Sequence, residues 1–410
     1  MQQWRVFLVL SLVLVARTTV ADDAAVLPQG RWHVGAEARV SLPITKQFTP
    51  SGGTEDLAVN FNRNLDRLAF PDLQSVETGF RLPAGTATFG RSVVDFTRHL
   101  QIYAGQAAYG LTDRLTVGLR VPYWTQDIKV TATLDTRTAT VGFNPAVPGG
   151  VAPLRVPGTR VATIDDIQGF ITRLGFRRVQ RWADASFSDL FGTLKYQYYR
   201  TAPWRLAVSG TVRFPTGRWE DPNNLVDYPT GYGAWGLGVQ LHQDYRWSPF
   251  RRTAGAGVRS PGDVLLSTSV RYEVILPDTK AFRVCNINQP LCPNYDPQVH
   301  RDVGDLVEAE VATTVGLLPG LTLTPQYTYV HKFPDHFRGN LGFPYGELTA
   351  ETDVDSHILD VRLTYSTASL VAAKRFPVPV SVGFLYTDRL ASTNSRLQTR
   401  YLGVSLTSVW

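Results

Sequence analysis

The feature that most constrains the fold of this chain is an alternation of apolar and polar residues sustained over about twelve positions. Between Arg31 and Leu42, Glu37 and Arg39 stand on one face of an extended chain, and every residue of the opposite face is apolar: Trp32, Val34, Ala36, Ala38, Val40 and Leu42. Strands of globular proteins usually contain about five or six residues, whereas a strand that crosses a bilayer needs about nine to eleven. The alternation therefore predicts a strand with one face toward lipid and the other toward water.

The same pattern recurs between clusters of turn-forming residues. It gives twelve expected strands, at residues 31–42, 96–109, 115–123, 190–198, 204–214, 235–247, 264–276, 307–315, 321–329, 359–365, 378–386 and 402–410. An even number suits an antiparallel barrel with both ends on the periplasmic side. We therefore predict an all-β fold, a transmembrane antiparallel up-and-down β-barrel of about 12 strands with long extracellular loops. The segment Ser248 to Asp263 is either a long turn or a hidden hairpin, so ten and fourteen strands remain alternatives.

One expected strand has a less regular pattern than the others. In residues 96–109, Gln106 falls on the same face as Leu100, Ile102 and Ala104. The alternation alone therefore does not assign the faces of this strand.

The expected connections alternate in length, as they do in outer-membrane barrels. Short turns are expected at Gly110, Ala202, Pro319 and Ala391 to Ser395, and long polar segments at about 43 to 95, 131 to 183, 277 to 302 and 334 to 354. The connection Ala391 to Ser395 precedes the last strand, so we expect it to be extracellular although it is short. The other three short turns are expected to be periplasmic.

Both ends of the sequence resemble signals for export and assembly. An apolar run from Val6 to Val15 is too short to cross a bilayer as a helix, and small residues precede Asp22, so residues 1–21 are expected to be a signal peptide cleaved after Ala21. The mature part, residues 22–410, is expected to be the barrel in the bacterial outer membrane, in contact with lipid and lipopolysaccharide. Trp410 continues the apolar face of the last strand, a pattern that resembles the signal read by the barrel-assembly machinery.

The charge of the chain does not indicate a nucleic-acid partner. The formal net charge is +6, but the arginines are scattered at alternate strand positions and form no runs. Export also makes a nucleic-acid partner implausible. We expect a small-molecule solute as the partner instead.

Two cysteines are present, Cys285 and Cys292, in a loop rich in proline and asparagine. In an exported chain, two cysteines so close in sequence predict one disulfide that closes the loop. A metal site would need further ligands, and His300 is the only histidine nearby.

The charged residues on the inward faces are the candidate functional residues. They are Glu37, Arg39, Arg120, Lys195, Arg205, Arg213, Arg246, Arg271, Glu273, Glu308, Glu310, Asp360 and Arg362. They either line a selective lumen or pair with one another across a filled interior, and the sequence does not decide between the two.

An enzyme is the less favoured class. The best local cluster is His331, Asp335 and His336, with Ser356 and His357 at the start of the next strand. No Gly-x-Ser-x-Gly motif is present, and histidine and aspartate are ordinary residues at a barrel rim. We predict no catalytic residues, no cofactor and no metal.

Two turns resemble a known family. The first is Tyr109 to Leu115 followed by Val121-Pro122-Tyr123, and the second is Phe214 to Gly217 followed by Asp221-Pro222 and Gly231-Tyr232-Gly233. They are similar to the outer-membrane family named for the meta-pathway of phenol degradation. The resemblance implies a porin-like Gram-negative channel or transporter for small, hydrophobic or aromatic solutes. The alternatives are a plugged structural or adhesive barrel without transport, and, less favoured, an outer-membrane hydrolase.

Overall fold

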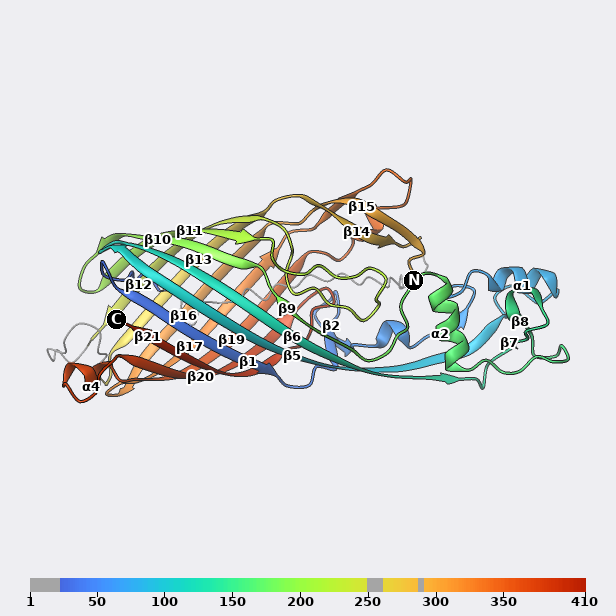
Figure 1. Cartoon of the computed structure of the whole chain (residues 1–410), viewed down its shortest axis with the longest axis horizontal. Helices are drawn as coiled ribbons and strands as arrows, with labels where there is room; N and C mark the ends of the chain where they lie inside the picture. The colour runs from blue at the N-terminus through green and yellow to red at the C-terminus, as the bar shows by residue number, and fades with distance from the viewer. Residues whose placement is uncertain (1–22, 249–260, 287–290) are drawn as a thin grey trace.

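The computed structural model describes residues 23–248, 261–286 and 291–410. In these residues, twelve antiparallel strands close into one barrel, which confirms the predicted fold class. The barrel strands are β1 Trp32–Ser41, β5 Thr88–Thr112, β6 Leu115–Asp135, β10 Leu190–Arg200, β11 Trp204–Phe214, β12 Gly236–Trp247, β13 Val264–Ile275, β16 Leu306–Leu318, β17 Leu321–Lys332, β19 Val354–Ser366, β20 Val380–Ser392 and β21 Arg400–Val409. Each strand pairs with the next barrel strand along the chain, and β1 closes the barrel between β21 and β5 (Figure 1).

The exterior of the barrel is apolar and its interior polar, as the alternation requires. On β12, Val239 and Leu241 are each 58% exposed, whereas His242 and Asp244 are 2% and 1% exposed. Aromatic side chains gather at both rims of the exterior. The rings of Trp32 and Tyr109 lie 4.8 Å apart at the end that holds the C-terminus, and those of Phe214 and Trp235 lie 5.2 Å apart at the other end. Such girdles mark the two membrane interfaces.

The short connections lie at the end of the barrel that holds the C-terminus, which is the periplasmic end in such barrels. They join β5 to β6, β10 to β11 and β16 to β17. The connection from β19 to β20 at this end is longer and contains α4 Ala368–Ala372. The connection from β20 to β21 lies at the opposite, extracellular end. Strands β12 and β13 pair directly, and residues 249–260 between them lie outside the described residues.

Strands β5 and β6 continue far beyond the barrel on the extracellular side (Figure 1). The predicted loops 43–95 and 131–183 are therefore partly strand, since β5 begins at Thr88 and β6 ends at Asp135. The prediction was wrong at these boundaries because neither face of the extension meets lipid, so no strict alternation marks it. Its apolar side chains, Phe89 among them, pack instead on a small extracellular core with Phe70 and Phe170.

The remaining helices and strands lie at the extracellular end of the barrel. They are β2 Lys46–Phe48, β3 Thr54–Asp56, η1 Val59–Phe61, β4 Asn64–Asp66, α1 Leu73–Gly79, β7 Val141–Phe143, η2 Pro148–Gly150, β8 Val151–Pro153, α2 Ile164–Arg173, β9 Trp182–Phe187, β14 Asp278–Val284, β15 Asn294–Asp302, β18 His336–Arg338 and α3 Gly346–Thr349. Helix α2 begins at a capping box in which Thr163 and Asp166 exchange hydrogen bonds. In the described ranges, no helix has the length and apolar character needed to span a bilayer.

The irregular strand β5 has an apolar interior face. Leu100, Ile102 and Ala104 are all buried, whereas Tyr103 is 42% exposed on the outside. Leu100 and Ile102 pack against Trp124 and other buried side chains. The alternation is weak here because the barrel interior at this level is filled by side chains rather than by water.

Candidate functional site

The structure places most of the thirteen charged candidates in the barrel interior. Nine are buried, namely Glu37, Arg39, Arg120, Arg213, Arg271, Glu273, Glu308, Glu310 and Asp360. Three are partly buried, namely Lys195, Arg205 and Arg362. Arg246 is exposed, because it lies at the periplasmic end of β12, where the interior opens to solvent.

One set of these side chains links four barrel strands, β1, β6, β19 and β20. The Nε atom of Arg39 lies 2.6 Å from Glu37, and its Nη1 atom lies 3.3 Å from Asp360 and 3.0 Å from the hydroxyl of Thr387. Arg120 approaches Glu37 from the other side, at 4.0 Å. Because these charges are buried, each must be compensated by a partner.

A second set occupies the opposite wall. Arg213 on β11 lies 2.7 Å from Glu273 on β13, and Arg271 lies 3.3 Å from Glu273 and 3.6 Å from Glu308 on β16. The mixed charges therefore pair across strands. Some of them also border a cavity, so the same side chains both pair with one another and line the lumen.

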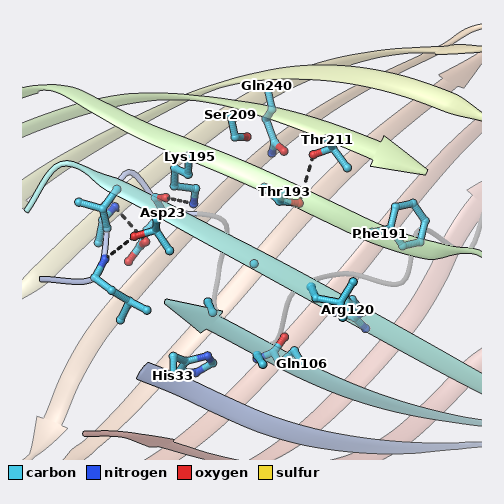
Figure 2. A pocket seen from close by; sticks show the side chains of 18 of the residues that line it. Asp23, His33, Gln106, Arg120, Phe191, Thr193, Lys195, Ser209, Thr211 and Gln240 are labelled. Carbon is cyan, nitrogen blue, oxygen red and sulfur yellow. Dashed lines mark hydrogen bonds between the residues drawn. The ribbon is translucent and has the colours of Figure 1, made fainter. Parts of the chain in front are cut away.

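The interior contains a cavity of about 360 Å³ in its periplasmic half. Figure 2 shows side chains from several strands around it, including Arg120, Thr193, Lys195 and Gln240. Arg271, Glu308 and Glu310 complete the charged part of the lining. A space of this size and polarity holds water or a small polar solute.

The N-terminal segment, residues 23–29, borders this cavity from the periplasmic end. Lys195 donates a hydrogen bond of 2.8 Å to the carbonyl of Asp23, and Gln197 donates one of 2.6 Å to the carbonyl of Ala24 (Figure 2 shows the first). The backbone N–H of Leu27 donates to the hydroxyl of Thr116 at 2.8 Å. The segment therefore occupies part of the lumen.

The first family-like turn holds this segment. A Cβ atom on Gly110 would lie 2.1 Å from the carbonyl oxygen of Pro28, so only glycine allows the segment to pass so closely. The carboxylate of Asp113 accepts a hydrogen bond of 3.0 Å from the backbone of Gln29. The turn therefore also serves as the attachment of the N-terminal segment.

The connection from β11 to β12, residues 215–235, folds into the extracellular half of the barrel, and we call it the inward loop. All residues from Val226 to Ala234 are buried. The fully buried carboxylate of Asp189 accepts hydrogen bonds from the backbone N–H groups of Gly217, Tyr232 and Gly233, at 2.9, 2.7 and 3.2 Å. Asp189 lies in the short interruption between β9 and β10, where its side chain can accept hydrogen bonds from the inward loop.

Six buried arginine and tyrosine residues meet around the inward loop, and we call them the Arg–Tyr cluster: Arg98, Arg389, Arg396, Tyr228, Tyr232 and Tyr401. The guanidinium of Arg98 lies 4.3 Å from the ring centre of Tyr228. Burial lowers the pKa of Arg396, in the connection from β20 to β21, to about 10, so it is still charged at neutral pH. The alternation did not reveal these three arginines, because Arg98 lies on the irregular strand, Arg389 lies near the end of β20 and Arg396 lies in the connection that follows.

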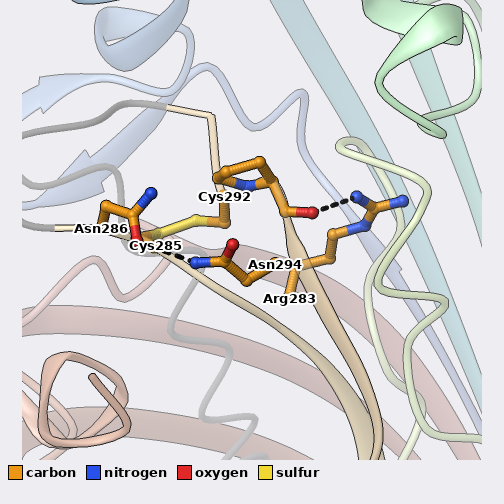
Figure 3. Close-up of a disulfide and its surroundings, with 6 residues drawn as sticks. Arg283, Cys285, Asn286, Cys292 and Asn294 are labelled. Carbon is orange, nitrogen blue, oxygen red and sulfur yellow. Dashed lines mark hydrogen bonds between the residues drawn. A yellow bond between two sulfur atoms is a disulfide. The ribbon is translucent and has the colours of Figure 1, made fainter. Parts of the chain in front are cut away.

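The two cysteines close the tip of the hairpin formed by β14 and β15 outside the barrel (Figure 3). Their sulfur atoms lie at bonding distance, and their Cα atoms are 3.9 Å apart. Arg283 beside them donates a hydrogen bond of 3.0 Å to the carbonyl of Pro293.

We expect the exported protein to contain no alkylatable thiol before reduction. Closing a loop of this length removes chain entropy worth about 2 kcal/mol from the unfolded hairpin. Replacing both Cys285 and Cys292 by serine should therefore make the hairpin more sensitive to protease while the barrel still migrates as a folded species in unheated gels. Mass spectrometry of unreduced peptides and limited proteolysis measure the two effects. Two free thiols in the exported protein would contradict the pairing.

The histidine, aspartate and serine side chains considered as a hydrolase site do not lie together in one site. His331 lies 2.9 Å from Asp355, and His357 lies 2.6 Å from the hydroxyl of Tyr327, all on the outer rim. Ser356 is buried inside, against Ser392. Among the described residues, no group of three or more histidine, cysteine, aspartate and glutamate side chains is placed to hold a metal ion.

The fold and the lined interior define this chain as a transmembrane β-barrel with a partly occupied lumen. No protein-family model matches the chain, and no curated protein matches it. The name of the resembled family is therefore not confirmed.

Solved structures with a similar fold are outer-membrane barrels. An outer membrane channel from Pseudomonas putida F1 shares 11% identity over 96% of this chain and 100% of that chain, with a TM-score of 0.49. The toluene transporter TodX of Pseudomonas putida shares 9% identity over 93% of this chain and 90% of that chain, with a TM-score of 0.32. The monoaromatic hydrocarbon channel CymD shares 9% identity over 94% and 89%, with a TM-score of 0.33. These similarities are too distant to transfer a substrate.

Proposed function

We propose that this chain is an outer-membrane channel for small solutes, narrowed by the N-terminal segment at the periplasmic end and by the inward loop at the extracellular end. The observation that carries the proposal is the cavity of about 360 Å³, lined by charged side chains inside a barrel with an apolar exterior. A barrel that served only as a structural support would gain stability from an apolar filling instead, since buried ion pairs contribute little.

The polarity of the lining bears on the class of solute. Arg120, Arg271 and Glu308 border the cavity, so a wholly apolar molecule would displace water from these charged groups without offering hydrogen bonds in return. Aromatic rings, among them Phe191 and the tyrosines of the Arg–Tyr cluster, supply apolar contact along the same interior. The proposed solute is therefore small and polar or charged, with an aromatic group permitted.

The proposal includes a location in the bacterial outer membrane, reached after cleavage of a signal peptide. The signal peptide predicted at residues 1–21 lies outside the described residues, and cleavage after Ala21 stays a prediction. Trp410 exchanges backbone hydrogen bonds with Trp32 at the seam where the barrel closes, at 2.9 and 3.1 Å. This position favours recognition of the last strand by the assembly machinery while the seam is still open.

Single-channel recording tests the proposal. In planar bilayers, we expect the full protein to give small unitary currents, and a variant without residues 23–27 to conduct at least about twofold more, because the segment no longer obstructs the lumen. Arg375→Gln, in an exposed periplasmic turn, is the matched control and should conduct as the unmodified protein does.

The alternative of a plugged structural barrel has its own support, since both segments lie in the lumen. Absence of stable unitary currents from both the full protein and the shortened variant would establish the plugged barrel and rule out the channel.

A further inference from the structure

Two arginines of the Arg–Tyr cluster, Arg98 and Arg396, form no ion pair with a carboxylate of the described residues. The carboxylates that act on their charges are Asp227 for Arg98 and Asp335 for Arg396. Asp227 already accepts two hydrogen bonds from Arg218, at 2.6 and 2.7 Å. Asp335 already binds the buried ammonium group of Lys332. The cluster therefore differs from the two paired sets in the barrel wall, where each arginine has a carboxylate of its own.

Arg396 shows the imbalance most clearly. The residue is 2% exposed, and none of its three guanidinium nitrogens has a hydrogen-bond acceptor among the described residues. Two nitrogens of Arg98, which is 6% exposed, also lack one, as does the hydroxyl of the buried Tyr232. A buried charge without a partner costs several kcal/mol. These donors therefore have no acceptor among the described residues, and a bound anion would supply one.

The surroundings of the cluster are aromatic and apolar. Tyr228 and Tyr401 pack in one cluster with the buried ring of Trp124 and the aliphatic side chains of Leu100 and Ile102. The site therefore combines cationic donors with aromatic rings. Guanidinium groups bind planar carboxylates through paired hydrogen bonds, and aromatic rings pack against one another.

We propose that the Arg–Tyr cluster is an anion-binding subsite of the lumen, that it takes small aromatic carboxylates, and that Arg98 and Arg396 hold the carboxylate while the tyrosines contact the ring. The subsite rests on the proposed channel function and specifies its solute class. A free inorganic anion such as phosphate shares the charge but not the ring, so it should bind more weakly.

Calorimetric titration of the full protein in detergent tests the subsite without depending on conduction. We expect benzoate to bind more tightly than acetate or inorganic phosphate, and benzyl alcohol, which has the ring without the charge, not to bind. Arg396→Met should weaken benzoate binding about tenfold or more, since hydrogen bonds to charged groups are the strong ones. Arg396→Lys should restore part of the affinity. Arg338→Met, at an exposed extracellular position, should leave it unchanged.

A separate measurement distinguishes a binding role from a structural one. Methionine replaces the unpartnered charge with an apolar chain of similar length, so Arg396→Met should be as stable to denaturant as the unmodified protein, or more stable. A variant that loses both stability and binding would show that Arg396 is structural. The subsite is also overturned if benzoate does not bind, if Arg396→Met binds it equally, or if phosphate binds as tightly.

The subsite and the channel can fail independently. Unitary currents without benzoate binding would leave the channel and remove the subsite. Benzoate binding without currents would leave the subsite in a barrel that does not transport.

Discussion

Replacing Val208 by arginine should cost about 2 to 4 kcal/mol of the free energy of unfolding in lipid vesicles, the cost of a charge on the lipid face near mid-membrane. Val208 lies near the middle of β11, paired with Tyr196 and Leu241, whose side chains are 44% and 58% exposed on the barrel exterior. In lipid, no water reaches these positions to solvate a guanidinium group. Urea titration monitored by tryptophan fluorescence measures the loss.

The matched control places the same charge on the opposite face of the same strand. Thr211 borders the cavity, and its hydroxyl makes a long contact of 3.4 Å with the hydroxyl of Thr193, so Thr211→Arg should lose much less stability and change conductance instead. Ser209 is the poorer control, because its hydroxyl lies 2.8 Å from the ring of the buried His242, and replacing Ser209 would remove this hydrogen bond. Equal losses for Val208→Arg and Thr211→Arg would mean that β11 does not face lipid as described.

Replacing Asp189 by alanine should cost about 3 to 5 kcal/mol and should also release the inward loop, because truncating one member of a buried charged network leaves its partners unpaired. Three backbone N–H groups of the loop and the guanidinium of Arg213 donate to this carboxylate. The loop would then be free to leave the lumen, so the conductance should rise as the stability falls. Denaturant titration and single-channel recording measure the two changes together.

The control for Asp189 is an ion pair at the surface. Asp127 binds Arg181 at 2.9 Å at an exposed position, so Asp127→Asn should cost less than about 1 kcal/mol and leave the conductance unchanged. A destabilised Asp189→Ala protein with unchanged conductance would show that the loop stays in place by other contacts. That result would show that the inward loop does not limit the conductance of the lumen.

The two family-like turns have a common structural role. Gly110 and Asp113 of the first turn receive the N-terminal segment, and Gly217 and Gly231 of the second pack against the carboxylate of Asp189. A Cβ atom on Gly231 would lie 2.7 Å from the carboxylate carbon of Asp189. These residues therefore matter for the two segments that narrow the lumen rather than for contact with lipid.

Much of the barrel could be predicted from the sequence, and the reason is the bilayer. Lipid demands an apolar side chain at every second position across the membrane, so strands such as β12, with Leu237, Val239 and Leu241 outside, reveal themselves by pattern alone. The prediction was poor where that demand ends. The extensions of β5 and β6 lie beyond the membrane, where one face packs on the extracellular core and the other, with Val93, is exposed, and Leu100 and Ile102 turn inward to a packed interior.

By itself, therefore, the sequence determined a barrel of about twelve strands and the face of most side chains, because the alternation of each strand follows from its own contact with lipid. Only the tertiary structure decided what fills the lumen. The N-terminal segment, the inward loop and the Arg–Tyr cluster join residues from distant parts of the chain, such as Arg98 with Tyr228 and Asp189 with Tyr232. Contacts of this kind follow from barrel closure and loop packing, which bring distant residues together without any periodic pattern in the sequence.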